Sequence, residues 1–140
     1  MALFLNTIKA ELTGTISAAD RELWKVLEDF VYVSDLVGVI VVPKDFMTDF
    51  ASVPRLPFVF LLTGNTAHRA ALIHDYLYTS NQYSRKLSDE IFKEAIIAAG
   101  EPEWRANMMY AGVRVGGQGS WESAGPRQTE AVKQFMNKEN

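Results

Sequence analysis

The sequence contains no cysteine, which excludes disulfide bonds and thiolate metal sites. The fold must therefore depend on packing, and any metal would need oxygen or nitrogen ligands. No apolar run approaches the ~20 residues that cross a bilayer, so we expect no membrane span. The 14 Lys and Arg residues form no basic run and are outnumbered by 17 Asp and Glu residues, so nucleic acid is not an expected partner.

A length of 140 residues predicts one core rather than several. The Gly- and Ser-rich stretch "GGQGSWESAGP" that follows Val115 indicates a loop. We therefore predict a single α+β domain over residues 1–117 and a C-terminal extension, residues 118–140, made of a loop and a short helix. The apolar side of that last helix could dock on the same chain or on a partner.

The first third of the chain is rich in β-branched and aromatic residues over 3–13, 23–33 and 37–43, which is typical of short strands. These runs predict a small N-terminal antiparallel β-sheet. The middle run could instead begin as a helical turn at "AADRELWKVLEDF". A proline-rich loop follows, because prolines at 43, 54 and 57 prevent a continuous helix.

From Asn65 onward the apolar residues recur with a helical period, which predicts an antiparallel cluster of three helices. Asn65 or Thr66 can cap the first helix, which runs to about Tyr78. The second is capped by Ser84 or Ser88 and stops at Gly100. Pro102 suits the first turn of the third helix. One stripe of that helix carries Trp104, Met108, Ala111 and Val115. Trp104, Met108 and Met109 are expected to pack in the core or at an interface.

The stretch "LIHDYLY", residues 72–78, places an adjacent His-Asp pair in an otherwise apolar helix, where burial costs free energy unless a partner binds them. Asp89 lies at the start of the apolar face of the next helix. If the two helices are antiparallel neighbours, Asp89 can accept one N–H of His74, fix its tautomer and leave the other nitrogen basic. The alternative is a core histidine tied into a structural network.

Asp75 points to a different side of its helix from His74, where its carboxylate could hold a cation. Upstream, "TDFASVP" could present Thr48, Asp49 and Ser52 to the same cleft, although all three are also common turn and cap residues. Three arginines could pair with these acidic groups: Arg55, Arg85 and Arg114.

Four segments in order, "VPKDFMTDFASVPR", "LIHDYLY", "SDEIFKEAI" and "MMYAGVRVGG", resemble a phage- and prophage-encoded family of unknown function with TDFASVP and HDxLY signatures. The resemblance covers roughly residues 20–117. That family supplies no activity to carry over. Asp45 stands where the family has glycine, so the turn before Phe46 departs from the family pattern.

The order "HDYLY" then "SDEIF" is similar to the active-site helix pair of phospholipase A2, over about 25 residues. This resemblance implies that His74 is a base that activates water and that Asp89 orients it. It further implies that Tyr78 donates a hydrogen bond to Asp89 and that Asp75 binds calcium. The glycine-rich calcium loop and the cysteines of those enzymes are absent here, so Ca²⁺ would need other oxygen ligands such as Asp49.

These observations lead us to expect a phage protein of the virion or the host cytoplasm. It would be a tail or neck accessory protein with a hydrolase-like site for a lipid or envelope ester, and other virion proteins would be its partners. Two alternatives without catalysis are a purely structural virion component and a host-directed inhibitor.

Overall fold

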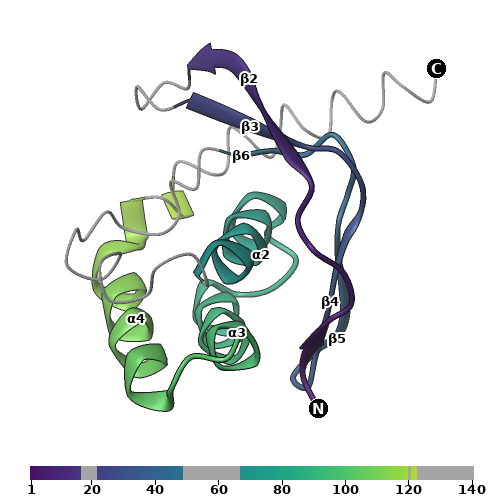
Figure 1. Cartoon of the computed structure of the whole chain (residues 1–140). Helices are drawn as coiled ribbons and strands as arrows, with labels where there is room; N and C mark the ends of the chain where they lie inside the picture. The colour runs from purple at the N-terminus through teal and green to yellow at the C-terminus, as the bar shows by residue number, and fades with distance from the viewer. Residues whose placement is uncertain (17–21, 49–66, 120, 123–140) are drawn as a thin grey trace.

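A computed structural model describes residues 1–16, 22–48, 67–119 and 121–122. Within these ranges the chain forms six strands followed by three helices, so the predicted α+β class is confirmed. In Figure 1 the helices α2 and α3 lie between the strands and helix α4. None of the helices in the described part of the chain is long and apolar enough to cross a membrane.

The strands form two antiparallel sheets of three strands each, with orders β1-β4-β5 and β2-β3-β6, rather than the single sheet that we expected. Their bounds are β1 Leu3–Phe4, β2 Ala10–Ile16, β3 Glu22–Val26, β4 Phe30–Ser34, β5 Gly38–Val42 and β6 Met47–Thr48. The predicted run 23–33 is split between the sheets, because the chain bends at 27–29, where Asp29 Oδ1 accepts the backbone N–H of Lys44 at 2.8 Å. The alternative of a helical turn is wrong for Glu22–Val26, which form a strand, while residues 18–21 of that stretch lie outside the described residues.

The sheet β1-β4-β5 is apolar on both faces. Phe30, Tyr32 and Val42 point inward and are buried against the helices. Val39 and Val41 alternate with the buried residues of β5 and are 63% and 39% exposed. The inward face therefore supplies the core, and the outward face remains open to solvent.

The helices are α2 Ala67–Ser80, α3 Arg85–Ala98 and α4 Glu103–Gly116. Ser84 caps α3, because its side chain accepts the backbone N–H of Leu87 at 3.1 Å, which decides between the two predicted caps. The expected caps of α2, at positions 65 and 66, lie outside the described residues. Connections at 81–84 and 99–102 are short, so consecutive helices pack on each other.

The packing of α4 confirms part of the prediction. Met109 is buried together with Ala106 and Val113. The stripe that contains Trp104 and Met108 faces solvent, with Trp104 53% and Val115 88% exposed. Both sets of residues have a helical period, and the face with the small Ala106 allows the closer approach to α3.

Candidate functional site

The end of α2 and the start of α3 bring three polar side chains together. His74 and Tyr78 lie one turn apart on α2, and the connection 81–84 returns the chain so that Asp89 faces both. His74 Nε2 lies 2.6 Å from Asp89 Oδ1, and the Tyr78 hydroxyl donates to the same oxygen at 2.6 Å. The three residues singled out as catalytic candidates are therefore in contact, while their role in catalysis remains a prediction.

The second carboxylate oxygen of Asp89 binds arginine. Arg114 Nη1 on α4 donates to Asp89 Oδ2 at 2.8 Å, and Arg85 Nη1 lies 3.5 Å from the same oxygen. Asp89 thus joins all three helices, and we refer to His74, Tyr78, Arg85, Asp89 and Arg114 as the Asp89 cluster. A fully satisfied buried polar cluster of this kind rigidifies the core around it.

The centre of the Asp89 cluster is closed to solvent, because the side chains of His74, Tyr78 and Asp89 have no exposed surface. The imidazole lies between aromatic rings, with centroid distances of 4.1 Å to Tyr78 and 4.6 Å to Phe92. Water or a substrate could reach the imidazole only after neighbouring groups move.

Burial and hydrogen bonding set the protonation states of the cluster. Burial lowers the pKa of His74, and this outweighs the opposing effect of Asp89, so the imidazole is neutral. Burial alone would raise the pKa of Asp89, but hydrogen bonds from His74, Tyr78 and Arg114 outweigh it and hold that pKa below its usual value. Because a carboxylate only accepts, Nε2 of His74 carries the proton and Nδ1 is the basic nitrogen.

Asp75 belongs to a different environment, as its position on the helix predicted. It is fully buried, and the hydroxyl of Thr48 on β6 donates to its Oδ2. Asp49, the second proposed metal ligand, lies outside the described residues, as do Ser52 and Arg55. Among the residues that the structure describes, no group of three or more His, Asp or Glu side chains is arranged to hold a metal ion.

Two contributors to the cluster escaped sequence reasoning, which treated the stretch after Val115 as a loop. Gly117 is buried, and a Cβ there would lie 2.6 Å from the Tyr78 hydroxyl. The ring of Trp121 meets the Tyr78 ring edge-on at a centroid distance of 5.1 Å. The Gly-Gly pair at 116–117 was the available signal, because a glycine after a helix can mark close packing as well as a turn.

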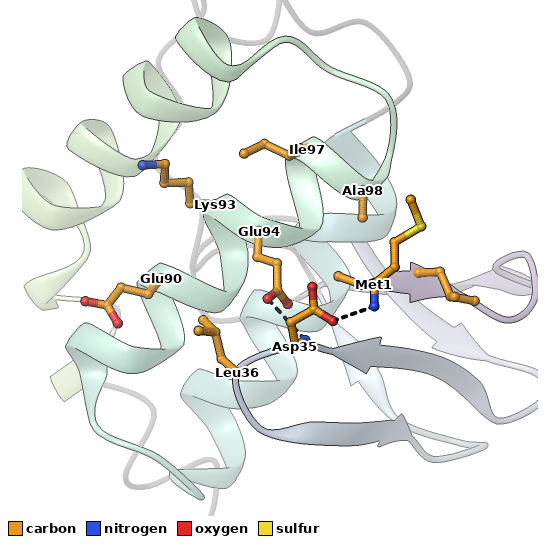
Figure 2. A pocket seen from close by; sticks show the side chains of 10 residues that line it. Met1, Asp35, Leu36, Glu90, Lys93, Glu94, Ile97 and Ala98 are labelled. Atoms are coloured by element: carbon orange, nitrogen blue, oxygen red, sulfur yellow. Dashed lines mark hydrogen bonds and ion pairs between the residues drawn. The ribbon is translucent and has the colours of Figure 1, made fainter.

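An open hollow of about 630 Å³ lies on another face of α3 (Figure 2). Glu94 stands in it, accepting the Tyr32 hydroxyl at 2.6 Å and the backbone N–H of Asp35 at 3.2 Å. Its lining also includes Leu36 and Ile97 but no member of the Asp89 cluster. The hollow and the cluster are thus separate features of one helix.

Residues 24–113 match the family model described as Protein of unknown function (DUF1353), which covers more than half of the chain. The chain belongs to the DUF1353 family. The match confirms the expectation of a domain of unknown function. The matched residues include His74, Tyr78 and Asp89, and Arg114 lies one residue beyond their end. No curated protein and no solved structure matched the chain.

Proposed function

We propose that this DUF1353 protein is a hydrolase in which His74 is the general base, acting on an ester of a lipid or cell-envelope component. The observation that carries the proposal is the 2.6 Å contact of His74 Nε2 with Asp89 Oδ1, an oxygen that also accepts the Tyr78 hydroxyl. A carboxylate that fixes the tautomer of an imidazole is the usual orienting partner of a histidine base.

In the proposed reaction, Nδ1 of His74 takes a proton from a water molecule while the water oxygen attacks the ester carbonyl carbon. Asp89 stabilises the imidazolium that forms. The imidazolium then gives its Nδ1 proton to the alcohol oxygen as the ester C–O bond breaks, which releases the alcohol and the carboxylic acid. Since the imidazole has no exposed surface, the reaction needs a movement that admits water and the ester.

The phospholipase A2 resemblance predicts a calcium ion at Asp75. Among the described residues, no group of three or more His, Asp or Glu side chains surrounds Asp75 and its partner Thr48, whereas Ca²⁺ takes about six to eight oxygen ligands. This donor set does not fit the ion by itself. Calcium binding at Asp75 with Asp49 remains a prediction from the phospholipase A2 resemblance.

The biological setting that we propose is a tailed phage. The order of the segments around TDFASVP and HDxLY, which resembles a phage-encoded family, supports this. A tail or neck accessory protein that meets the cell envelope would have access to lipid esters, and its partners would be other virion proteins.

A purely structural role in the virion is the second candidate, and a specific observation favours it. Asp89 binds two arginines as well as His74 and is fully buried, which is the arrangement of a satisfied structural network. In that case the Asp89 cluster ties three helices together and the histidine performs no chemistry.

Activity of the purified protein on phospholipid vesicles and on a soluble short-chain ester, with and without added Ca²⁺, tests the proposal. His74→Gln should lower kcat by about 10²–10⁴-fold, the usual contribution of a general base. His68→Gln on the same helix is the matched control, because His68 is exposed and should leave kcat unchanged. Absence of hydrolysis by the wild-type protein, together with infectious particles that contain the folded His74→Gln protein, would establish the structural role instead.

A further inference from the structure

We propose that the end of α4 is a positioning element for His74, in which Arg114 and Gly117 fix the groups that hold the imidazole. This inference rests on the proposed function in naming His74 as the base. The contacts themselves stand independently of any activity.

Arg114 fixes the orientation of the Asp89 carboxylate. It donates to Oδ2 at 2.8 Å, while Oδ1 is already shared by His74 and Tyr78. With both oxygens bound, the carboxylate cannot rotate without breaking at least one charge-assisted hydrogen bond. The direction in which His74 presents its Nδ1 is therefore tied to a residue of α4.

Arg85 holds the end of α4 in place so that Arg114 can reach Asp89. Its Nη1 donates to the carbonyl oxygen of Val113 at 3.2 Å, and its Nη2 to that of Arg114 at 3.4 Å. These carbonyls belong to the last turn of the helix, where a cation is favourable. The Val113 carbonyl also accepts the backbone N–H of Gly117 at 2.8 Å. Arg85 thus acts on Asp89 mainly through α4, because its own contact with Asp89 is longer, at 3.5 Å.

Gly117 provides the space in which the Tyr78 hydroxyl sits. A Cβ at this position would lie 2.4 Å from the Val113 carbonyl oxygen, 2.6 Å from the Tyr78 hydroxyl and 3.3 Å from Arg85 Nη1. The backbone φ of −84° is one that any residue adopts, so the requirement for glycine is space and not conformation. Any side chain would have to displace the hydroxyl that donates to Asp89 or move the end of α4.

The position of the Asp89 carboxylate and of the Tyr78 hydroxyl therefore depends on one short segment, residues 114–117. A shift of the end of α4 would loosen Asp89 through Arg114 and release Tyr78 through Gly117 at the same time. The base would then lose its fixed tautomer without any change to α2 itself.

NMR of the histidine ring nitrogens in the full chain tests this inference. The protein has two histidines, and His68→Gln assigns the His74 signals. Arg114→Gln and Gly117→Ala should each move the Nε2–H resonance of His74 and its titration midpoint. Arg114→Lys, which keeps the charge, should restore most of the wild-type signal. Val115→Ala, a change on the exposed side of the same turn, should leave the signal unchanged.

Kinetics on the same variants separate this inference from the proposed function. If the protein hydrolyses esters, Arg114→Gln and Gly117→Ala should lower kcat by up to about 100-fold with little change in KM, because misplacing a reactive group costs that much. If it does not, the proposed function fails while the NMR shifts still decide the positioning role. Unchanged His74 signals in whichever of the two variants folds would overturn the inference.

Discussion

Helix α3 carries two carboxylates that each accept a tyrosine hydroxyl at 2.6 Å, and the comparison between them shows what distinguishes the Asp89 cluster. Tyr78 donates to Asp89 inside the helical cluster, and Tyr32 donates to Glu94 beside the open hollow of Figure 2. Burial, followed by the neighbouring carboxylate, raises the pKa of both tyrosines. The tyrosine–carboxylate hydrogen bond alone therefore does not mark a functional site.

The difference lies in the other partners of each carboxylate. Asp89 is fully buried and binds an imidazole and two guanidinium groups, whereas Glu94 is partly exposed and its second oxygen accepts a backbone N–H. Water can replace a lost partner of Glu94 but not one of Asp89. The pairing of the buried Asp89 charge with the two arginines, and not the contact with a tyrosine hydroxyl, therefore distinguishes Asp89 from Glu94.

The largest expected effect comes from neutralising each carboxylate in turn. Asp89→Asn leaves the partly buried Arg114 and the buried His74 facing a neutral group and should lower the free energy of unfolding by about 3–5 kcal/mol. Glu94→Gln keeps an acceptor for Tyr32 and should cost less than about 1 kcal/mol. Glu90→Gln, next to Asp89 on α3, is the control for loss of a charge. Urea denaturation measures all three, and equal losses at 89 and 94 would contradict the comparison.

The second largest expected effect is a dependence of stability on pH, which arises from His74 and Asp89 in the Asp89 cluster. Because the pKa of His74 is lowered in the folded protein, the unfolded chain takes up a proton that the folded protein does not. Stability should be complete above pH ~6.5 and fall by at most about 1.4 kcal/mol per pH unit below it. The lowered pKa of Asp89 adds a second loss only below pH ~4.

Urea titrations of wild type and His74→Gln between pH 5 and 8 isolate this effect, because the variant lacks the group that titrates. The wild-type protein should show the steeper decline toward acid. Parallel pH profiles for the two proteins would mean that His74 takes up its proton equally in the folded and unfolded states.

Removing the two hydroxyls should give the smallest difference. Tyr78→Phe deprives a buried carboxylate of a donor and should cost about 1.5–3 kcal/mol, as for hydrogen bonds to charged groups. Tyr32→Phe leaves Glu94 accessible to water and should cost about 0.5–1.5 kcal/mol, the range of an ordinary hydrogen bond. Thermal unfolding of the two variants compares them directly, and a larger loss for Tyr32→Phe would reverse the assignment of the two environments.

The sequence predicted the contact between His74 and Asp89 because it depends on local geometry. The two residues are 15 apart, and helical periodicity with a short connection is enough to bring them together. The sequence does not predict which acid each arginine binds. Arg114 reaches Asp89 only when α4 packs against α3, and that packing is not a local feature. The exposed stripe with Trp104 shows the same limit, since periodicity identifies faces of a helix but not the one that packs.

The division into two sheets and the bond between Tyr32 and Glu94 could not be predicted in the same way. The latter joins residues 62 apart and depends on how β4 packs against α3. The sequence pattern predicts only a loop at Gly117. Its role depends on the groups that a side chain there would contact, and these are known only from the packed structure. Asp75 was correctly assigned a different side of α2, while its contact with Thr48 needed the position of β6.

The order of the elements along the chain has a consequence for synthesis on the ribosome. Strands β4 and β5, of which Val39 and Val41 stay exposed even in the folded protein, emerge before the helices that cover their other face. Until translation reaches α3, the nascent chain presents apolar strands on both faces, the kind of segment that chaperones shield from aggregation.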